Sequence, residues 1–126
     1  EVSVDSEPQA NNHNIKALIV NGQYFEAAKQ ILFIEDSRIL SEFNDLNDFY
    51  YWSSFVYYNL GNQLEAYNNI SMIEGRDSYP EILFLEALIL ESLGERDSSE
   101  NTLKQIINDF PDNDYSSYSK NILLEN

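Results

Sequence analysis

The chain of 126 residues contains no cysteine, and this absence removes several kinds of chemistry. Without thiols it can form no disulfide, no thiolate nucleophile and no cysteine-based metal site. The only histidine, His13, lies near the polar start of the chain, so no Ser-His-Asp or Cys-His constellation can be assembled. We therefore expect a protein that is not an enzyme, with no catalytic residue, no cofactor and no metal.

Basic residues are scarce, since 7 Lys and Arg stand against 22 Asp and Glu, for a formal net charge of -15. Such a charge repels nucleic-acid phosphates and anionic lipid surfaces. No apolar run approaches the roughly 20 residues that span a bilayer, so we expect neither nucleic-acid binding nor membrane insertion. Two readings of the acidity remain open, a solvated outer face or a surface for a basic partner.

The first eleven residues, EVSVDSEPQAN, are polar, contain a proline and show no hydrophobic period. They include neither an initiator Met nor the apolar core of a signal peptide, so we expect 1–11 to be a leader or linker of a trimmed or processed chain. The whole chain is 43% hydrophobic and 13% aromatic, which is enough for one folded domain, and we place that domain at 12–126.

Three of the four glycines, Gly22, Gly61 and Gly94, share one pattern of neighbours. At eleven, seven and four residues before each glycine stand Asn11, Ile15 and Leu18, then Tyr50, Ser54 and Tyr57, then Leu83, Ala87 and Leu90. At five, nine and twelve residues after each stand Ala27, Ile31 and Ile34, then Ala66, Ile70 and Ile73, then Ser99, Leu103 and Ile106. Both spacings are helical, so each glycine is predicted to join two helices.

The residue types in this pattern have a physical reason. A glycine that ends a helix can adopt positive φ without a Cβ clash, and a small residue five positions later lets the second helix approach the first. The interval from Gly22 to Gly61 is about six residues longer than the next one, and the surplus lies between Glu35 and Asn47. Its Ile39, Leu40, Phe43 and Leu46 predict an added helical turn packed between the first two units.

The pattern resembles the tetratricopeptide repeat, a family of stacked helical hairpins. The match is best from Pro80 to Pro111, with Leu83, Ala87, Leu90, Ser99, Leu103 and Pro111 at the consensus places. The middle unit has Ser78 where the proline is expected, and the first unit departs further, with Asn11 and Ile15 at its opening places. The segment IINDFPDNDYSSYSKNIL also resembles repeat ends in bacterial envelope assembly proteins of this family, which slightly favours a periplasmic or envelope location over the cytoplasm.

The fold expected from this resemblance is an all-α solenoid of about three repeats plus a C-terminal capping helix. The repeat units are placed at 12–46, 47–79 and 80–111, and the cap at 114–124. The predicted helices are 12–21, 24–35, 47–60, 63–74, 80–93, 96–109 and 114–124. Asn113 or Asp114 is expected to cap the last of them.

In this family the first helix of each hairpin lines a concave groove. The resemblance places Tyr51, Phe55, Tyr58, Phe84, Leu88 and Glu91 in that groove, which would bind a partner segment through aromatic and apolar anchors. Apart from Asn12 and Lys16, aromatic and acidic residues stand where the family's carboxylate clamp has Lys, Arg and Asn, so we do not expect that clamp here. A basic flank of the partner could instead meet Asp48, Glu81 and Glu91. The alternative is that these rings are ordinary core and these acids ordinary surface.

We therefore expect a protein-interaction scaffold. One rival is a self-assembling subunit, a homo-oligomer that uses the same surfaces. Another is a regulatory module of a larger protein. The sequence names no partner.

Overall fold

The computed structural model describes residues 12–36 and 46–125, and within them the chain is all-α, with no strand. The helices are α1 (Asn12–Val20), α2 (Tyr24–Asp36), α3 (Leu46–Asn59), α4 (Gln63–Ile70), α5 (Pro80–Ser92), α6 (Arg96–Asp109) and α7 (Asp114–Glu125). A short 3-10 helix, η3 (Arg76–Ser78), precedes α5. The expected leader, 1–11, and most of the expected inserted turn, 37–45, lie outside the described residues.

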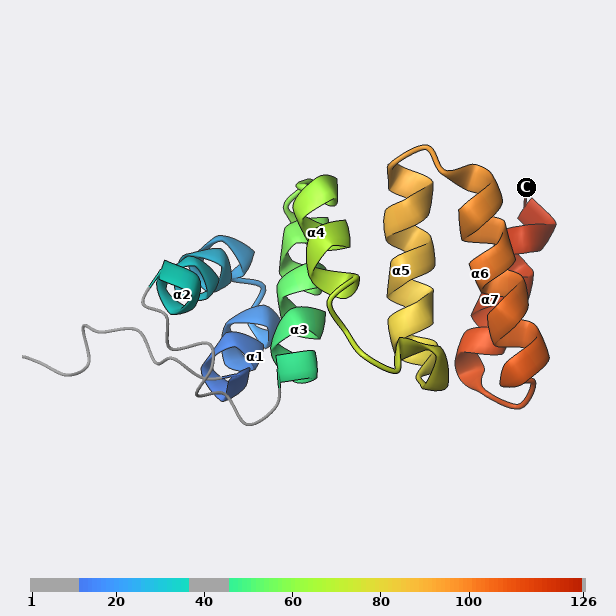
Figure 1. Cartoon of the computed structure of the whole chain (residues 1–126), viewed down its shortest axis with the longest axis horizontal. Coiled ribbons are helices and arrows are strands. Elements are labelled where there is room, and N and C mark those ends of the chain that lie inside the picture. Colours follow the sequence, from blue (N-terminus) through green and yellow to red (C-terminus); the bar gives the residue numbers. More distant parts are fainter. Residues whose placement is uncertain (1–11, 37–45, 126) are drawn as a thin grey trace, which may run out of the picture.

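Consecutive helices pack as hairpins, α1 with α2, α3 with α4, and α5 with α6, while α7 packs on both α6 and α5 (Figure 1). The odd-numbered helices also contact one another in series, α1 with α3, α3 with α5, and α5 with α7. Figure 1 shows the helices following one another along the long axis, from α1 and α2 at one end to α6 and α7 at the other. The odd-numbered helices therefore share a continuous set of contacts.

The predicted glycine turns are present. Gly61 has φ 83°, its N–H donates to the Tyr58 carbonyl at 3.1 Å, and the N–H of Asn62 donates to the Tyr57 carbonyl at 2.9 Å. This pair of bonds is the Schellman motif, which closes a helix on a left-handed residue. Gly22 and Gly94 repeat both the positive φ and the bonds. The three hairpins thus begin their reversals with the same backbone geometry.

The predicted face of the second helices is buried throughout. Ala27, Ile31, Ile34, Ala66, Ile70, Ile73, Ser99, Leu103 and Ile106 are all buried. The small residue of this face lies close to the partner helix, since the Ser99 hydroxyl donates to the Ala87 carbonyl of α5 at 2.8 Å. The spacing read from the glycines therefore identified the packed side of α2, α4 and α6.

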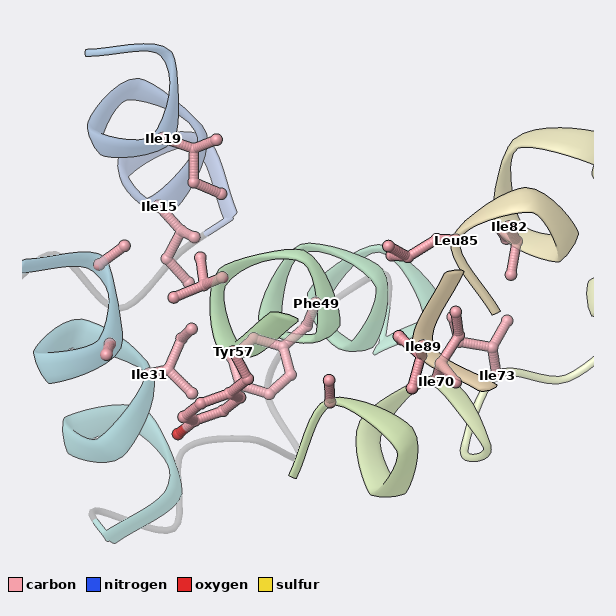
Figure 2. Packing of buried hydrophobic residues seen from close by; sticks show 14 of the residues in the cluster. Ile15, Ile19, Ile31, Phe49, Tyr57, Ile70, Ile73, Ile82, Leu85 and Ile89 are labelled. Carbon is pink, nitrogen blue, oxygen red and sulfur yellow. The ribbon is translucent and has the colours of Figure 1, made fainter. Parts of the chain in front are cut away.

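Two clusters of buried side chains share α5 between them. The larger cluster runs from α1 to α5, and Figure 2 shows Phe49 and Tyr57 of α3 between Ile31 of α2 and Ile89 of α5. The smaller cluster joins Leu83 and Ala87 of α5 to α6, with α7 packed against it. Because α5 is buried on two sides, its sequence PEILFLEALILES is apolar almost all round.

The predicted helix over 63–74 is shorter than expected, because α4 ends at Ile70. The N–H groups of Met72 and Ile73 bond three residues back, to the Asn69 and Ile70 carbonyls, so the chain tightens out of the α-helix. Gly75, at φ 72°, then turns the chain into η3, and Ile73 stays buried. The helical period thus continued in the sequence beyond the point where the backbone leaves the helix.

The other expected helices agree with the structure to within one or two residues. At the start of α7, the backbone N–H of Tyr115 donates to Oδ1 of Asn113 at 2.8 Å. Of the two proposed caps, Asn113 is therefore the one that acts.

Candidate protein-binding groove

Helix α3 carries the aromatic residues from which the site is built. Its sequence, LNDFYYWSSFVYYN, places rings on every side of the helix. Phe49 and Tyr57 are buried in the larger core cluster, while Tyr51, Trp52 and Phe55 remain partly exposed. Since α3 packs against α1, α2, α4 and α5, it needs a wide apolar surface, and the partly exposed rings pack against the core while keeping some surface open to solvent.

The partly exposed rings form two groups. On α3, the Trp52 ring lies 5.1 Å from that of Tyr51 and 5.9 Å from that of Phe55, both edge-on. On α5 and α7, the Phe84 ring lies 5.1 Å from that of Tyr115 and 6.1 Å from that of Tyr118. Edge-on and tilted contacts at these distances are favourable, so each group is held by its own rings.

A cavity of about 200 Å³ separates the two groups. Its lining residues are Tyr51, Phe55, Glu81, Phe84, Leu85, Leu88 and Tyr115. We call it the apolar cavity, because Glu81 is the only charged residue among the described residues that line it. It is built from α3, α5 and α7, three helices of the odd-numbered series.

A second cavity, of about 450 Å³, shares Tyr51, Glu81 and Tyr115 with the first. Its other lining residues are Lys16, Asp48, Trp52 and Ile82. We call this one the polar cavity, and the two together the groove. The groove therefore runs from α1 across α3 and α5 to α7, with apolar walls on one side of Glu81 and charged walls on the other.

An ion pair at the α1 end of the groove holds most of its charge. Lys16 Nζ lies 3.0 Å from Asp48 Oδ2 and 5.6 Å from the centroid of the Trp52 ring. The Trp52 indole N–H donates to the other oxygen of Asp48 at 3.1 Å. Asp48 therefore has a cation and a hydrogen-bond donor from within the chain.

Tyr51 is the one described group with a strongly displaced pKa. Burial raises the pKa of Tyr51 to about 12, and the neighbouring Tyr115 and Glu81 add to the effect. A tyrosinate here would lose hydration and face other negative groups, so the phenol stays protonated at neutral pH. Tyr51 thus offers the groove an aromatic ring and a neutral hydroxyl.

The structure brings together four of the six residues assigned to the groove from sequence, namely Tyr51, Phe55, Phe84 and Leu88. Tyr58 packs against the larger core cluster, as Tyr51 and Phe55 do, but it lines neither cavity of the groove. Glu91 is exposed at the end of α5, where Oε2 lies 3.5 Å from Arg96 Nη2 of α6. These two residues lie outside the groove.

Sequence reasoning did not assign Tyr115, Trp52, Leu85 and Ile82 to the groove. Tyr115 reaches it because α7 packs on α5, and with Tyr118 it covers one side of Phe84. The available signal was a pair of tyrosines three residues apart at the start of a helix already expected to cover the third unit. The groove rings are therefore neither free nor fully buried, since α7 covers them in part.

Comparison with family models, with curated proteins and with solved structures gives no match. In the described residues no three side chains of His, Cys, Asp or Glu are placed to hold a metal ion together. None of the described helices has both the length and the apolar character needed to cross a membrane.

Proposed function

We propose that the chain is a protein-interaction scaffold of the tetratricopeptide kind, whose groove binds a segment of another protein. Support for the solenoid comes from the three identical turns, the serial contacts of the odd-numbered helices and the small residue in each second helix. In such a stack the first helices of the hairpins line one concave side.

The observation that carries the proposal is the apolar cavity between α3, α5 and α7. It is open, walled by rings and leucines, and large enough for an apolar side chain. Rigid aromatic walls lose little conformational freedom on binding, which makes such a cavity suited to an anchor residue. The partner is therefore an extended or helical segment with at least one large apolar residue.

Leu88 is the best position for testing this function. Phe55 and Phe84 also pack on core clusters, so their replacement would confuse unfolding with lost binding. Leu88 lines the cavity and is only half-buried, and among the described residues it belongs to neither core cluster nor to the residues packed against them. Leu88→Glu should therefore leave the fold intact and put a charge in the cavity.

The test begins with the selection of peptides from a phage-displayed library on the immobilised chain. Affinities of the enriched peptides are then measured by calorimetry, and Leu88→Glu should weaken them by at least about tenfold. The matched control is Leu64→Glu on α4, where the leucine is 68% exposed and lines a different cavity. The proposal fails if no peptide is enriched, or if Leu64→Glu weakens binding as much as Leu88→Glu.

A second candidate, self-association, is favoured by the outer face of α2. Phe25 is 67% exposed, and Leu32 and Phe33, seven and eight residues further on, continue the same face. Exposed apolar side chains gathered on one face are a common mark of an interface. Light scattering after chromatography tests self-association, since a mass that stays monomeric at all concentrations excludes a homo-oligomer. If a homo-oligomer does form, Phe25→Glu should dissociate it.

A further inference from the structure

Among the described residues, the charged walls of the groove leave one negative charge without a cationic partner. Lys16 and Asp48 neutralise each other at 3.0 Å. Glu81, the third charged residue of the polar cavity, has no cation within 4 Å among residues 12–36 and 46–125. The polar cavity therefore carries a net charge of about -1, which a single monovalent cation would match.

Asp48, Glu81 and Glu91, the three acids that the sequence offers to a basic partner, differ in their surroundings. Asp48 forms an ion pair with Lys16 and accepts a hydrogen bond from the Trp52 indole. Glu91 forms an ion pair with Arg96 at the far end of α5. Glu81 lies in the first turn of α5 and is half-buried in the wall shared by both cavities. It is the acid best placed to act on a ligand in the groove.

The walls beside Glu81 suit a cation for a second reason. Tyr51 and Tyr115 line both cavities together with it, and the faces of aromatic rings attract Lys and Arg side chains. The chain uses the same interaction at the neighbouring ring, where Lys16 lies over Trp52. The Glu81 carboxylate and the two tyrosine rings together should attract a cation more strongly than either would alone.

We propose that Glu81, Tyr51 and Tyr115 form a subsite for a basic side chain, Arg or Lys, next to the apolar residue of the bound segment. This inference rests on the proposed function, because the apolar residue occupies the cavity that defines it. The segment then carries an apolar and a basic residue as neighbours, one for each side of Glu81. The chain's own charge of -15 attracts such a partner from a distance.

Short defined peptides test the subsite without knowledge of the natural partner. The probes are N-acetylated, C-amidated Phe-Arg, Phe-Gln and Phe-Glu, which contain no tryptophan. Trp52 is the only tryptophan of the chain and lines the polar cavity, so its fluorescence, excited at about 295 nm, reports binding in the groove itself. The full chain should bind Phe-Arg about fivefold more tightly than Phe-Gln, and Phe-Glu most weakly.

Variants at Glu81 decide whether this residue sets the preference. Glu81→Gln should lower the preference for Phe-Arg over Phe-Gln to the smaller part that the two rings supply, and Glu81→Lys should favour Phe-Glu, a reversal that a purely structural role would not produce. Glu125→Gln, an equal change of charge at an exposed site on α7, should keep the fivefold preference. Circular dichroism verifies that each variant is folded.

The inference is overturned if Phe-Arg does not bind, if it binds no better than Phe-Gln, or if its advantage survives undiminished in Glu81→Gln. Failure of the proposed function looks different. In that case Leu88→Glu leaves the affinities of Phe-Gln and of the selected peptides unchanged, because the apolar cavity is not used.

Discussion

The contact between α5 and α6 at Ser99 offers a sharp test of the hairpin packing. Ser99 is buried, and its hydroxyl donates to the Ala87 carbonyl across the hairpin at 2.8 Å. The equivalent places of the other hairpins hold Ala27 and Ala66, both fully buried. Two roles for Ser99 are possible, one polar through its hydrogen bond and one steric through its small size. The other hairpins suggest that size is the common requirement.

The two roles predict different costs. Ser99→Ala removes one hydrogen bond, but the Ala87 carbonyl lies inside α5 and keeps the helical N–H as a donor, so we expect a loss of about 0.5–1.5 kcal/mol. Ser99→Leu loses the same bond and also places two more heavy atoms between two packed helices. Overpacking of this kind costs about 1–3 kcal/mol, so the total loss should reach about 3 kcal/mol.

Urea unfolding followed by circular dichroism at 222 nm measures both costs as differences in the free energy of unfolding. Ser98→Leu, a change of equal size at the exposed neighbour, should stay within about 0.5 kcal/mol of the parent. The steric argument is refuted if Ser99→Leu is no less stable than Ser99→Ala. It is also refuted if Ser99→Ala alone costs the full amount, since the hydroxyl would then be what the hairpin needs.

Two further predictions concern the turn and the groove. A Cβ added at Gly61 would meet no atom within 4 Å, so Gly61→Ala is destabilising only because alanine disfavours the left-handed backbone at φ 83°. The less flexible unfolded chain offsets part of this strain, and we expect the free energy of unfolding to fall by about 1 kcal/mol. Thermal melts should show Gly61→Asn losing less, because Asn tolerates this conformation, and an equal or greater loss in Gly61→Asn would contradict the reasoning. The pKa of Tyr51 is about 12 in the folded state against 10 in the unfolded state, so the folded chain holds the phenol proton up to a higher pH. The stability that this proton contributes is therefore complete below pH 10 and is lost as the pH rises to about 12. Urea midpoints measured from pH 9 to pH 12 should fall less steeply in Tyr51→Phe, and parallel curves would show that Tyr51 titrates normally.

Much of the helical layout could be predicted from local pattern, because the signals are local. A glycine with positive φ ends a helix within a few residues of its own position, and the i, i+4, i+7 spacing marks the side that must be buried. All nine second-helix positions named from sequence are buried. The exception is α4, which ends at Ile70 although the apolar spacing continues to Ile73. A turn with hydrogen bonds to the residue three positions back follows the helix, and it buries Ile73 as a further helical turn would have done.

The candidate site was harder to predict, because its walls come from helices far apart in the chain. Phe84 and Leu88 could be named from their places in α5, but Tyr115 lies on α7 and enters the groove only through the packing of α7 on α5. Helical position alone also could not exclude Tyr58, which lies on the same helix as Tyr51 and Phe55 but lines neither cavity.

The sequence by itself determined that the chain is all-α, where its three hairpins reverse, and which side of each second helix is packed. These properties depend on backbone conformation and helical period, which neighbouring residues set. Only the tertiary structure decided which acid in the groove lacks a cationic partner among residues 12–36 and 46–125. Lys16 and Asp48 come from different helices, as do Glu91 and Arg96, and their meeting leaves Glu81 beside two tyrosines. Pairing across helices is a property of the packed fold, and no spacing along the chain encodes it.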